Sequence, residues 1–252
     1  MARRQRLDAE LVRRGLVESR SAAERAIEAQ RVLVNGAVAD KASRQVHAGD
    51  AVLLAGPPPR FVSRGGEKLD AALSAFGLDV QGLRVVDAGA STGGFTDCLL
   101  QRGAARVAAV DVGHGQLHPK IRNDERVLVL EKFHVRDLTP DAVGGEADLL
   151  TADLSFISLT RVIAPLAAVV RDQGAMVLLV KPQFEAGRAE VSRGQGVITD
   201  PLIHDRVREE VGQALAAAGC EVRGWTDSPI TGGDGNREFL VYATVERSGF
   251  RP

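Results

Sequence analysis

Two lysines and two carboxylates, Lys68, Asp153, Lys181 and Glu238, occupy positions from which one cleft could collect them. Lys68 begins a helical pattern, Asp153 and Lys181 follow apolar segments, and Glu238 opens one. A lysine ammonium beside a hydroxyl oxygen stabilises the negative charge of a developing alkoxide, and carboxylates can hold that lysine in place. Aligning the reacting atoms in line lowers the rest of the barrier. Singly each residue is an ordinary surface charge, but jointly they predict catalysis of methyl transfer to a ribose hydroxyl.

A glycine-rich segment predicts the cofactor site. The apolar run before it ends in Asp87 and leads through a turn into a helix. Such a turn lets backbone amides approach a ligand, and the helix N-terminus favours anionic groups. The residues expected to bind the cofactor are Asp87, Gly89, Ser91, Thr92, Gly93, Gly94 and Phe95, with Asp111 and Asp137 from the following strands.

The spacing favours S-adenosylmethionine over a nicotinamide dinucleotide. A dinucleotide site has Gly-x-Gly-x-x-Gly, whereas this loop reads Asp-Ala-Gly-Ala-Ser-Thr-Gly-Gly. Asp87 would repel a pyrophosphate but could pair with an ammonium group. Asp111 could accept hydrogen bonds from ribose hydroxyls, and Asp137 from an adenine amino group. A single such Asp would more often cap a turn, but three at successive strand ends favour the cofactor interpretation.

Strand and helix patterns alternate from residue 83 onward. Amphipathic stretches near 95–102, 158–171 and 201–218 separate apolar ones, and a further helix is expected over 67–76. The alternation predicts an α/β fold, a Rossmann-like and largely parallel sheet with ligands beyond the carboxyl ends of its strands. Its seven expected strands are 84–88, 106–111, 127–131, 148–152, 175–180, 220–226 and 238–245.

The first sixty residues differ from the rest in charge and pattern. They hold eleven Lys and Arg against seven Asp and Glu, whereas the remainder is net acidic. Leu7 and Leu11 mark one short helix, a capping box at Ser21 predicts the start of a second, and Asn35-Gly36 predicts a hairpin turn. These features predict a small α+β domain over 1–56, a linker over 57–66, and the Rossmann-like domain over 67–252.

The basic residues of this small domain are mostly arginines. A solvated helix face is the ordinary explanation of such charges, but the guanidinium fork pairs with phosphate oxygens in a bidentate manner that lysine lacks. We therefore expect RNA contacts from Arg3, Arg4, Arg6, Arg13, Arg14, Arg20, Arg25 and Arg31.

Bulk properties restrict the class of protein. The chain has 252 residues, 44% of them hydrophobic and 26% charged, with a net charge of −1. No apolar run approaches the roughly 20 residues of a membrane span, and the N-terminus lacks the apolar core of a signal peptide. A cytoplasmic location is expected. His114 and His118 are four apart, but Pro119 and flanking glycines disfavour a helix, so no metal site is expected.

Two stretches resemble known families. The order Arg-Leu-Asp-Ala-Glu-Leu, Ser-Arg-Ser-Ala-Ala-Glu and Val-Leu-Val-Asn-Gly resembles the small RNA-binding fold of ribosomal protein S-four. The four charged residues resemble the Lys-Asp-Lys-Glu tetrad of FtsJ-related ribose 2′-O-methyltransferases. Together with Ser-Arg-Gly-Gly-Glu-Lys-Leu, Lys-Pro-Gln-Phe-Glu and Gly-Asn-Arg-Glu-Phe, they make the chain from about residue 5 to 247 similar to the TlyA family, also labelled hemolysin A.

The resemblance implies a substrate and partners. It implies methyl transfer from S-adenosyl-L-methionine to the 2′-hydroxyl of cytidine in 16S and/or 23S ribosomal RNA, with ribosomal RNA or ribosomal subunits as partners. It also places the tetrad on Lys68, Asp153, Lys181 and Glu238. Two positions depart from the family pattern: His114 replaces an aromatic residue of Asp-Val-Gly-Tyr-Gly, and Phe61 stands where some members carry Trp in the linker.

Three other functions compete with RNA methylation. A small-molecule methyltransferase with an accessory domain predicts that deletion of residues 1–60 spares activity. A membrane-active hemolysin predicts leakage of liposomes, although the sequence offers no strongly amphipathic cationic helix. A ribosome-binding factor with an inactive body predicts cofactor binding without turnover. The sequence does not specify which nucleotide is modified or the oligomeric state.

Overall fold

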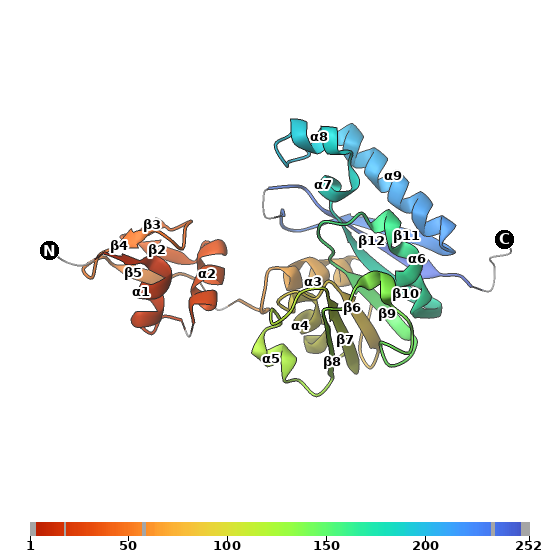
Figure 1. Cartoon of the computed structure of the whole chain (residues 1–252), viewed down its shortest axis with the longest axis horizontal. Coiled ribbons are helices and arrows are strands. Elements are labelled where there is room, and N and C mark those ends of the chain that lie inside the picture. Colours follow the sequence, from red (N-terminus) through yellow and green to blue (C-terminus); the bar gives the residue numbers. More distant parts are fainter. Residues whose placement is uncertain (1–3, 18, 57–58, 233–234, 248–252) are drawn as a thin grey trace. The chain divides into compact units, whose positions relative to one another are not determined.

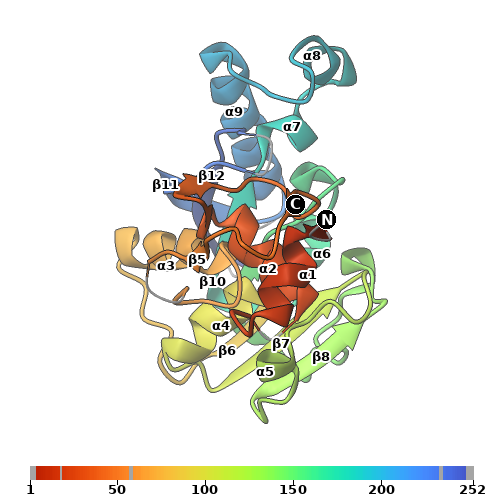
Figure 2. The ribbon, with the colours of Figure 1, turned by 90° about the vertical axis from the view of Figure 1, so that its left-hand side faces the viewer.

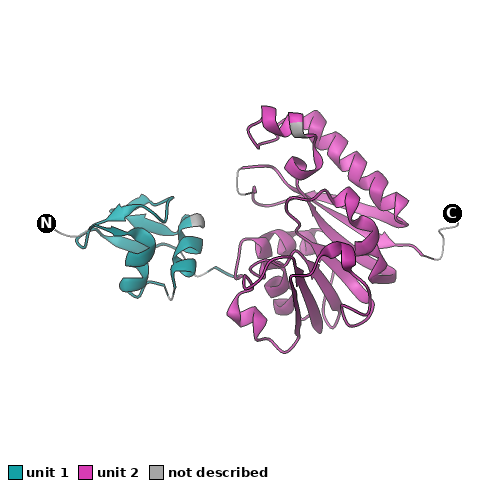
Figure 3. Ribbon diagram, in the orientation of Figure 1, with its two compact units in different colours: residues 1–60 teal, residues 61–252 magenta. Residues whose placement is uncertain are grey.

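The computed structural model describes residues 4–17, 19–56, 59–232 and 235–247, and it divides into two compact units. The first unit ends at Arg60 and the second begins at Phe61 (Figure 3). This division falls within the linker expected over 57–66. Each unit has its own apolar core, as its separate hydrophobic clusters show.

The smaller unit packs two helices against short strands. Helices α1 and α2 contribute Leu7, Leu11 and Ile27 to its core. Asn35 and Gly36 both have positive φ, of 53° and 83°, which is the conformation that a tight hairpin between antiparallel strands requires. The elements are β1 (Gln5–Arg6), α1 (Leu7–Arg13), α2 (Arg20–Glu28), β2 (Val32–Val34), β3 (Ala37–Val38), β4 (Gln45–Val46) and β5 (Val52–Leu54).

The cap of α2 differs from the expected one. Ser19, with extended backbone, accepts a hydrogen bond from Ala22 N at 3.1 Å. Ser21 already lies in the helix, so the capping box expected there was wrong. Ser19 serves as the N-cap because its extended backbone lets its hydroxyl accept from a free amide of the first helical turn, which the helical Ser21 does not do.

The larger unit is a seven-stranded sheet with helices on both faces (Figure 1). Its strands follow the order β11-β12-β10-β9-β6-β7-β8, and only the pairings of β12 are antiparallel. The expected Rossmann-like, largely parallel fold is therefore confirmed. The strands are β6 (Arg84–Ala88), β7 (Arg106–Asp111), β8 (Val127–Glu131), β9 (Ala147–Ala152), β10 (Val170–Val180), β11 (Cys220–Asp227) and β12 (Phe239–Val245).

Helices cover the two faces of this sheet with separate apolar layers. Leu69 of α3 and Leu99 of α4 belong to one layer, and Leu166 of α6 and Leu215 of α9 to the other. The short helices α7 and α8 lie beside α9 (Figure 2). The helices are α3 (Gly65–Ala75), α4 (Gly94–Gln101), α5 (Pro119–Arg122), α6 (Ile163–Ala168), α7 (Pro182–Glu185), α8 (Arg188–Arg193) and α9 (Pro201–Ala217), with 3-10 turns η1 (Val135–Asp137) and η2 (Leu159–Arg161).

The amphipathic stretch expected over 158–171 is the main difference from the sequence prediction. Its helical part is only α6, and β10 already begins at Val170. The pairing of β10 with β9 shifts in register between Val170 and Ala175. Strand β10 therefore begins before the apolar run from 175 to 180 that predicted it. No helix in the described ranges is long and apolar enough to cross a membrane.

Candidate active site at the carboxyl edge of the sheet

Three of the four predicted tetrad residues lie at one edge of the sheet. Asp153 directly follows β9 and Lys181 directly follows the neighbouring parallel strand β10. Glu238 directly precedes β12, which runs antiparallel to β10 with Phe239 opposite Val180. The register therefore sets Glu238 beside Lys181, at the edge where open α/β sheets bind ligands.

The tetrad forms two ion pairs at this edge. Lys181 Nζ lies 2.5 Å from Asp153 Oδ1 and donates a hydrogen bond to Ser155 Oγ at 3.1 Å. Lys68, from the first turn of α3, forms an ion pair with Glu238. Each lysine side chain is only 11% exposed. Because buried charges are costly unless paired, each carboxylate offsets the cost of covering its lysine.

Asp153 has unused hydrogen-bonding capacity. Its Oδ1 atom is buried and, apart from the close contact with the Lys181 ammonium, has no partner with hydrogen-bond geometry among the described residues. The distance makes the contact an ion pair, but the angles do not make it a hydrogen bond. The charge of the Asp153 carboxylate is therefore compensated at this oxygen by the Lys181 ammonium.

The glycine-rich loop lies against the same edge. Gly89 has a φ of 84°, and a Cβ there would lie 2.4 Å from the carbonyl oxygen of Asp153. Gly93, the N-cap of α4, has a φ of 94°, and Gly94 begins the helix. The two glycines with positive φ, Gly89 and Gly93, let the backbone pass close to Asp153 and into α4. Phe95, in contrast, is buried in the core.

One of the predicted acidic residues, Asp111, organises the loop. Asp111, at the end of β7, accepts hydrogen bonds from Ser91 N at 2.8 Å and Gly113 N at 2.6 Å. Asp137 is exposed in η1, beyond β8. The backbone carbonyl of Thr92 accepts a hydrogen bond from His118 N. Loop residues and acids thus gather at adjacent strand ends, as a nucleoside-type ligand would require.

Asp87 is fully buried beneath the loop. Its Oδ2 accepts a hydrogen bond from Thr96 Oγ1 at 2.6 Å, and Thr151 Oγ1 lies 3.4 Å from its Oδ1. Burial raises the pKa of Asp87 to about 7, the negative charge of Asp153 adds to this rise, and the hydrogen bond from Thr96 opposes it. The predicted pairing of Asp87 with an ammonium group stays a prediction.

His114 has a partner that the sequence did not reveal. Its Nδ1 lies 2.9 Å from Oε2 of Glu131, the last residue of β8, and Glu131 also accepts from Gly115 N. Arg122 forms an ion pair with the same carboxylate. The position that departs from the family pattern is therefore held by an acid at the third strand end. No metal-binding group of three His, Cys, Asp or Glu occurs in the described part of the chain.

An aromatic pair beside Lys181 also escaped the sequence analysis. Phe156 is 92% exposed and has a φ of 63°, a conformation that bulky residues rarely adopt. Its ring lies 5.3 Å from that of Phe184, and the Lys181 ammonium lies 5.7 Å from the centre of the Phe184 ring. The sequence carries no signal for this exposure, because a Phe next to Leu and Ile is normally expected in a core.

A buried asparagine stabilises the approach to Glu238. Asn236 is fully buried, accepts a hydrogen bond from Ile198 N at 2.8 Å and donates one to Gly196 O at 2.9 Å. It thereby connects the turn before β12 with the segment before α9. The position of Glu238 thus depends on packing that begins about forty residues earlier in the chain.

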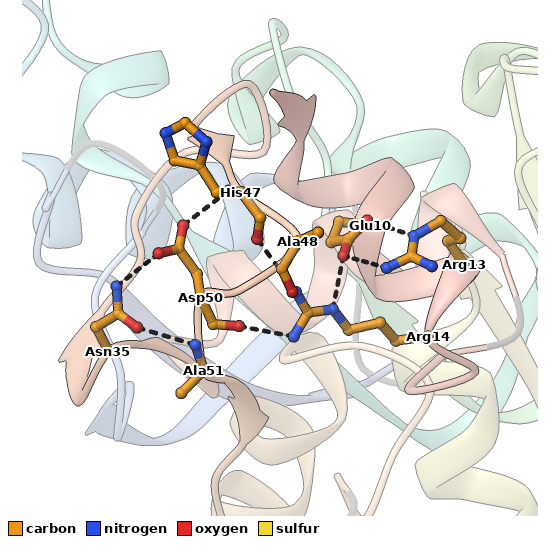
Figure 4. A network of polar contacts seen from close by, with 8 residues as sticks. All are labelled: Glu10, Arg13, Arg14, Asn35, His47, Ala48, Asp50 and Ala51. Atoms are coloured by element: carbon orange, nitrogen blue, oxygen red, sulfur yellow. Dashed lines mark hydrogen bonds and ion pairs between the residues drawn. The ribbon is translucent and has the colours of Figure 1, made fainter. Parts of the chain in front are cut away.

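Many of the predicted RNA-binding arginines make contacts within the smaller unit. Arg6 and Arg20 bind the carboxylate of Asp8. Arg13 and Arg14 bind that of Glu10 (Figure 4).

The remaining predicted arginines have different surroundings. Arg4 is exposed and donates to His47, whereas Arg31 donates to the carbonyl oxygens of Ala55 and Gly56. Arg25 is half-buried on α2. Arg3 lies outside the described residues.

Comparison with known proteins identifies the class. A family model for FtsJ-like methyltransferases matches residues 61–245, and a model for the S4 domain matches residues 5–52. A sheet of this topology, with a glycine-rich loop and lysine–carboxylate pairs at its carboxyl edge, is thus that of a methyltransferase joined to an S4 domain.

Individual relatives agree along nearly the whole chain. The 16S/23S rRNA (cytidine-2'-O)-methyltransferase TlyA of Mycobacterium tuberculosis is 47% identical, over 98% of this chain and 92% of that protein. Hemolysin A of Brachyspira hyodysenteriae is 38% identical, over 95% and 100%. A solved structure of a protein named as a hemolysin, from Streptococcus thermophilus, has a TM-score of 0.77 and 41% identity, over 98% and 90%. The chain therefore belongs to the TlyA family of FtsJ-like methyltransferases.

Proposed function

We propose that this chain methylates the ribose 2′-hydroxyl of cytidine in 16S and/or 23S ribosomal RNA, with S-adenosyl-L-methionine as the methyl donor, in the cytoplasm. The observation that carries the proposal is the pair of nearly covered lysines, each held by a carboxylate at the carboxyl edge of the sheet. The S4 domain supports RNA as the substrate, and the name of the Mycobacterium tuberculosis relative supports cytidine.

The loop residues fit a cofactor of this kind. A Cβ at Gly89 would collide with the carbonyl oxygen of Asp153 and one at Gly93 with Leu117, so these glycines let the loop turn closely at the strand end, and Asp111 fixes the loop amide of Ser91. In the proposed site, Asp111 and Asp137 would accept hydrogen bonds from the polar groups of the nucleoside, and Asp87 would support the loop beneath its methionine end. When bound, S-adenosylmethionine supplies an electrophilic methyl group.

The residues of this chain would activate the hydroxyl. Lys181 would donate a hydrogen bond to the 2′-oxygen and stabilise its negative charge as the hydroxyl proton leaves for solvent. Asp153 holds the Lys181 ammonium by an ion pair at 2.5 Å, and Ser155 Oγ accepts one of its hydrogen bonds. Lys68 and Glu238 would place a second paired charge beside the acceptor. Phe156 offers an exposed ring on which the target base could stack.

The test is transfer of labelled methyl from S-adenosylmethionine to unmodified 30S and 50S subunits, followed by nucleoside analysis. We expect a 2′-O-methylcytidine product in at least one subunit. Lys181→Ala should lower the turnover rate about 100- to 1,000-fold, because it removes a donor to the developing oxyanion, while cofactor binding measured by calorimetry stays unchanged. No product on either subunit despite cofactor binding would refute the substrate, and full turnover by Lys181→Ala would refute the mechanism.

A further inference from the structure

The smaller unit contains two clusters in which arginines surround a buried carboxylate. The Asp8 cluster consists of Asp8, Arg6 and Arg20, and the Glu10 cluster of Glu10, Arg13 and Arg14. Asp8 and Glu10 are two positions apart on α1, so their side chains do not face one another. Each cluster carries one net positive charge, but their arginines are used differently.

In the Glu10 cluster, the less exposed arginine, Arg14, stabilises the fold of the domain. Arg14, whose side chain is 20% exposed, donates to Glu10 and also to the carbonyl oxygens of His47, Ala48 and Asp50 (Figure 4). It thereby joins α1 to the loop between β4 and β5. Four acceptors within the domain leave this guanidinium little capacity for an outside ligand.

The Asp8 cluster has the opposite arrangement. Asp8 is fully covered, whereas the side chains of Arg6 and Arg20 are 45% and 59% exposed. Nη2 of Arg6 and Nη2 of Arg20 both bind the same oxygen, Asp8 Oδ2, at 2.9 and 2.8 Å. Asp8 also accepts from Ala9 N at 2.7 Å, which fixes the carboxylate on α1. Two exposed guanidinium groups are thus held side by side on a rigid anchor.

The two guanidinium groups keep donors for a ligand. Arg6 uses Nε and Nη2, and Arg20 uses Nη2, whereas their Nη1 groups have no hydrogen-bond partner among the residues that the structure describes. One phosphate would neutralise the single positive charge that Asp8 leaves, and its oxygens accept hydrogen bonds from paired guanidinium groups. In the absence of Asp8, the two like charges would repel one another.

We infer that Asp8 is a positioning residue for RNA binding: it holds Arg6 and Arg20 together as a clamp for one backbone phosphate. The inference rests on the proposed function only in taking RNA as the ligand of the S4 domain. Its tests measure binding without methyl transfer, so a failure of catalysis and a failure of the clamp give different results. Phosphate contacts of this kind would set the register of the RNA rather than read its bases.

Asp8→Asn in the full chain separates positioning from simple charge. It adds one positive charge, so charge alone predicts tighter binding of an unmodified 23S ribosomal RNA transcript. Positioning predicts that Kd rises about three- to tenfold, the effect of one lost phosphate contact. Glu10→Gln makes the same change of charge on the same helix and should leave Kd within about twofold. Binding by a folded Asp8→Asn variant that is as tight as wild type or tighter would overturn the inference.

The arginines give a second test that does not depend on the folding of Asp8→Asn. Because Arg6 and Arg20 would share one phosphate, Arg6→Gln, Arg20→Gln and the double variant should each lower the slope of log Kd against log salt by about one. A double variant that lowers the slope by about two would show independent contacts and overturn the clamp. Hydrogen exchange of α1 and α2 confirms that each variant is folded.

Glu24→Gln should change the Kd for RNA in the direction opposite to Asp8→Asn. Asp8 raises the pKa of Arg6 by its hydrogen bond and its charge, and the charge of Glu24, exposed on α2, adds to this rise. Glu24 therefore also opposes a phosphate at the clamp. Glu24→Gln should tighten RNA binding about twofold in wild type, and the gain should disappear when Arg6 and Arg20 are both Gln. A gain that persists in that background would show that Glu24 acts through general charge and not through Arg6 and Arg20, which would count against the clamp.

Discussion

Asp8 and Asp87 are both fully covered aspartates, one in each unit, and their pKa values shift in opposite directions. The hydrogen bond from Arg6 lowers the pKa of Asp8, and Arg20 lowers it further. Burial raises that of Asp87 to about 7, and the hydrogen bonds from Thr96 and Thr151 only partly oppose the rise. Asp8 is covered by the side chains of surface arginines and lies shallow, whereas Asp87 is enclosed by the sheet. The partners of a covered acid, and not its burial alone, decide its charge.

The same contrast applies to the cations of the two units. In the S4 unit, buried carboxylates hold four arginines, of which all but Arg14 remain about half exposed. In the methyltransferase unit, the carboxylates of Glu238 and Asp153 hold lysines that are themselves nearly covered. An exposed guanidinium can meet a long polyanion at the surface, whereas a covered ammonium can act only on a group that enters the site. Each arrangement suits the step proposed for its unit.

The pH dependence of stability should differ in sign between the two aspartates. Below about pH 7 folded Asp87 keeps a proton that the unfolded chain loses near pH 4, so wild type loses stability relative to Asp87→Asn as pH rises from about 4 to 7. The full effect is at most about 4 kcal/mol. Unfolding followed by fluorescence of Trp225, the single tryptophan, measures the larger unit.

Asp8→Asn is the matched control for this experiment. Because the folded pKa of Asp8 is lowered, the stability that it contributes is present above about pH 4 and is lost as pH falls below it. Asp8→Asn should therefore destabilise the smaller unit at neutral pH and not in acid. A difference between Asp87→Asn and wild type that is constant from pH 4 to 8 would contradict the raised pKa.

How far the sequence could predict these features depends on the range of the interaction. Apolar runs that end in a charged residue revealed the strand ends at Asp87, Asp111 and Lys181. The pairing of Lys68 with Glu238, 170 positions apart, followed only from resemblance, because residue spacing carries no information on such a contact.

The limits were sharper for surface residues. The arginine count indicated a basic domain. It did not indicate which guanidinium groups bind backbone carbonyl oxygens of the same domain, because this depends on how loops such as the one at His47 fold. Exposure of Phe156 depends on a left-handed backbone conformation that no residue type in its neighbourhood requires. These features follow from tertiary packing and lack a local pattern.

Removing the carboxylate should lower the free energy of unfolding more in the covered Lys68–Glu238 pair than in the more exposed Arg13–Glu10 pair. Glu238→Gln leaves the Lys68 ammonium covered without a counter-charge, at a cost of about 3 kcal/mol of unfolding free energy. In Glu10→Gln, Arg13 can turn to water and Arg14 keeps its backbone acceptors, so the cost should be about 1 kcal/mol. Hydrogen exchange resolved by unit measures both. Equal losses would show that exposure of the cation does not govern the cost.

Phe156→Ala is expected to have the smallest effect on stability, and it tests whether the exposed ring serves the substrate. The ring is 92% exposed, so its loss should leave the stability of the larger unit unchanged within about 0.5 kcal/mol. The KM for ribosomal RNA should rise about tenfold, because stacking of a base on an aromatic ring contributes about 1–3 kcal/mol. Phe156→Tyr keeps the ring and should keep the wild-type KM. If Phe156→Ala leaves KM unchanged, the aromatic pair does not hold the base, and the acceptor site would be defined by the lysine pairs alone.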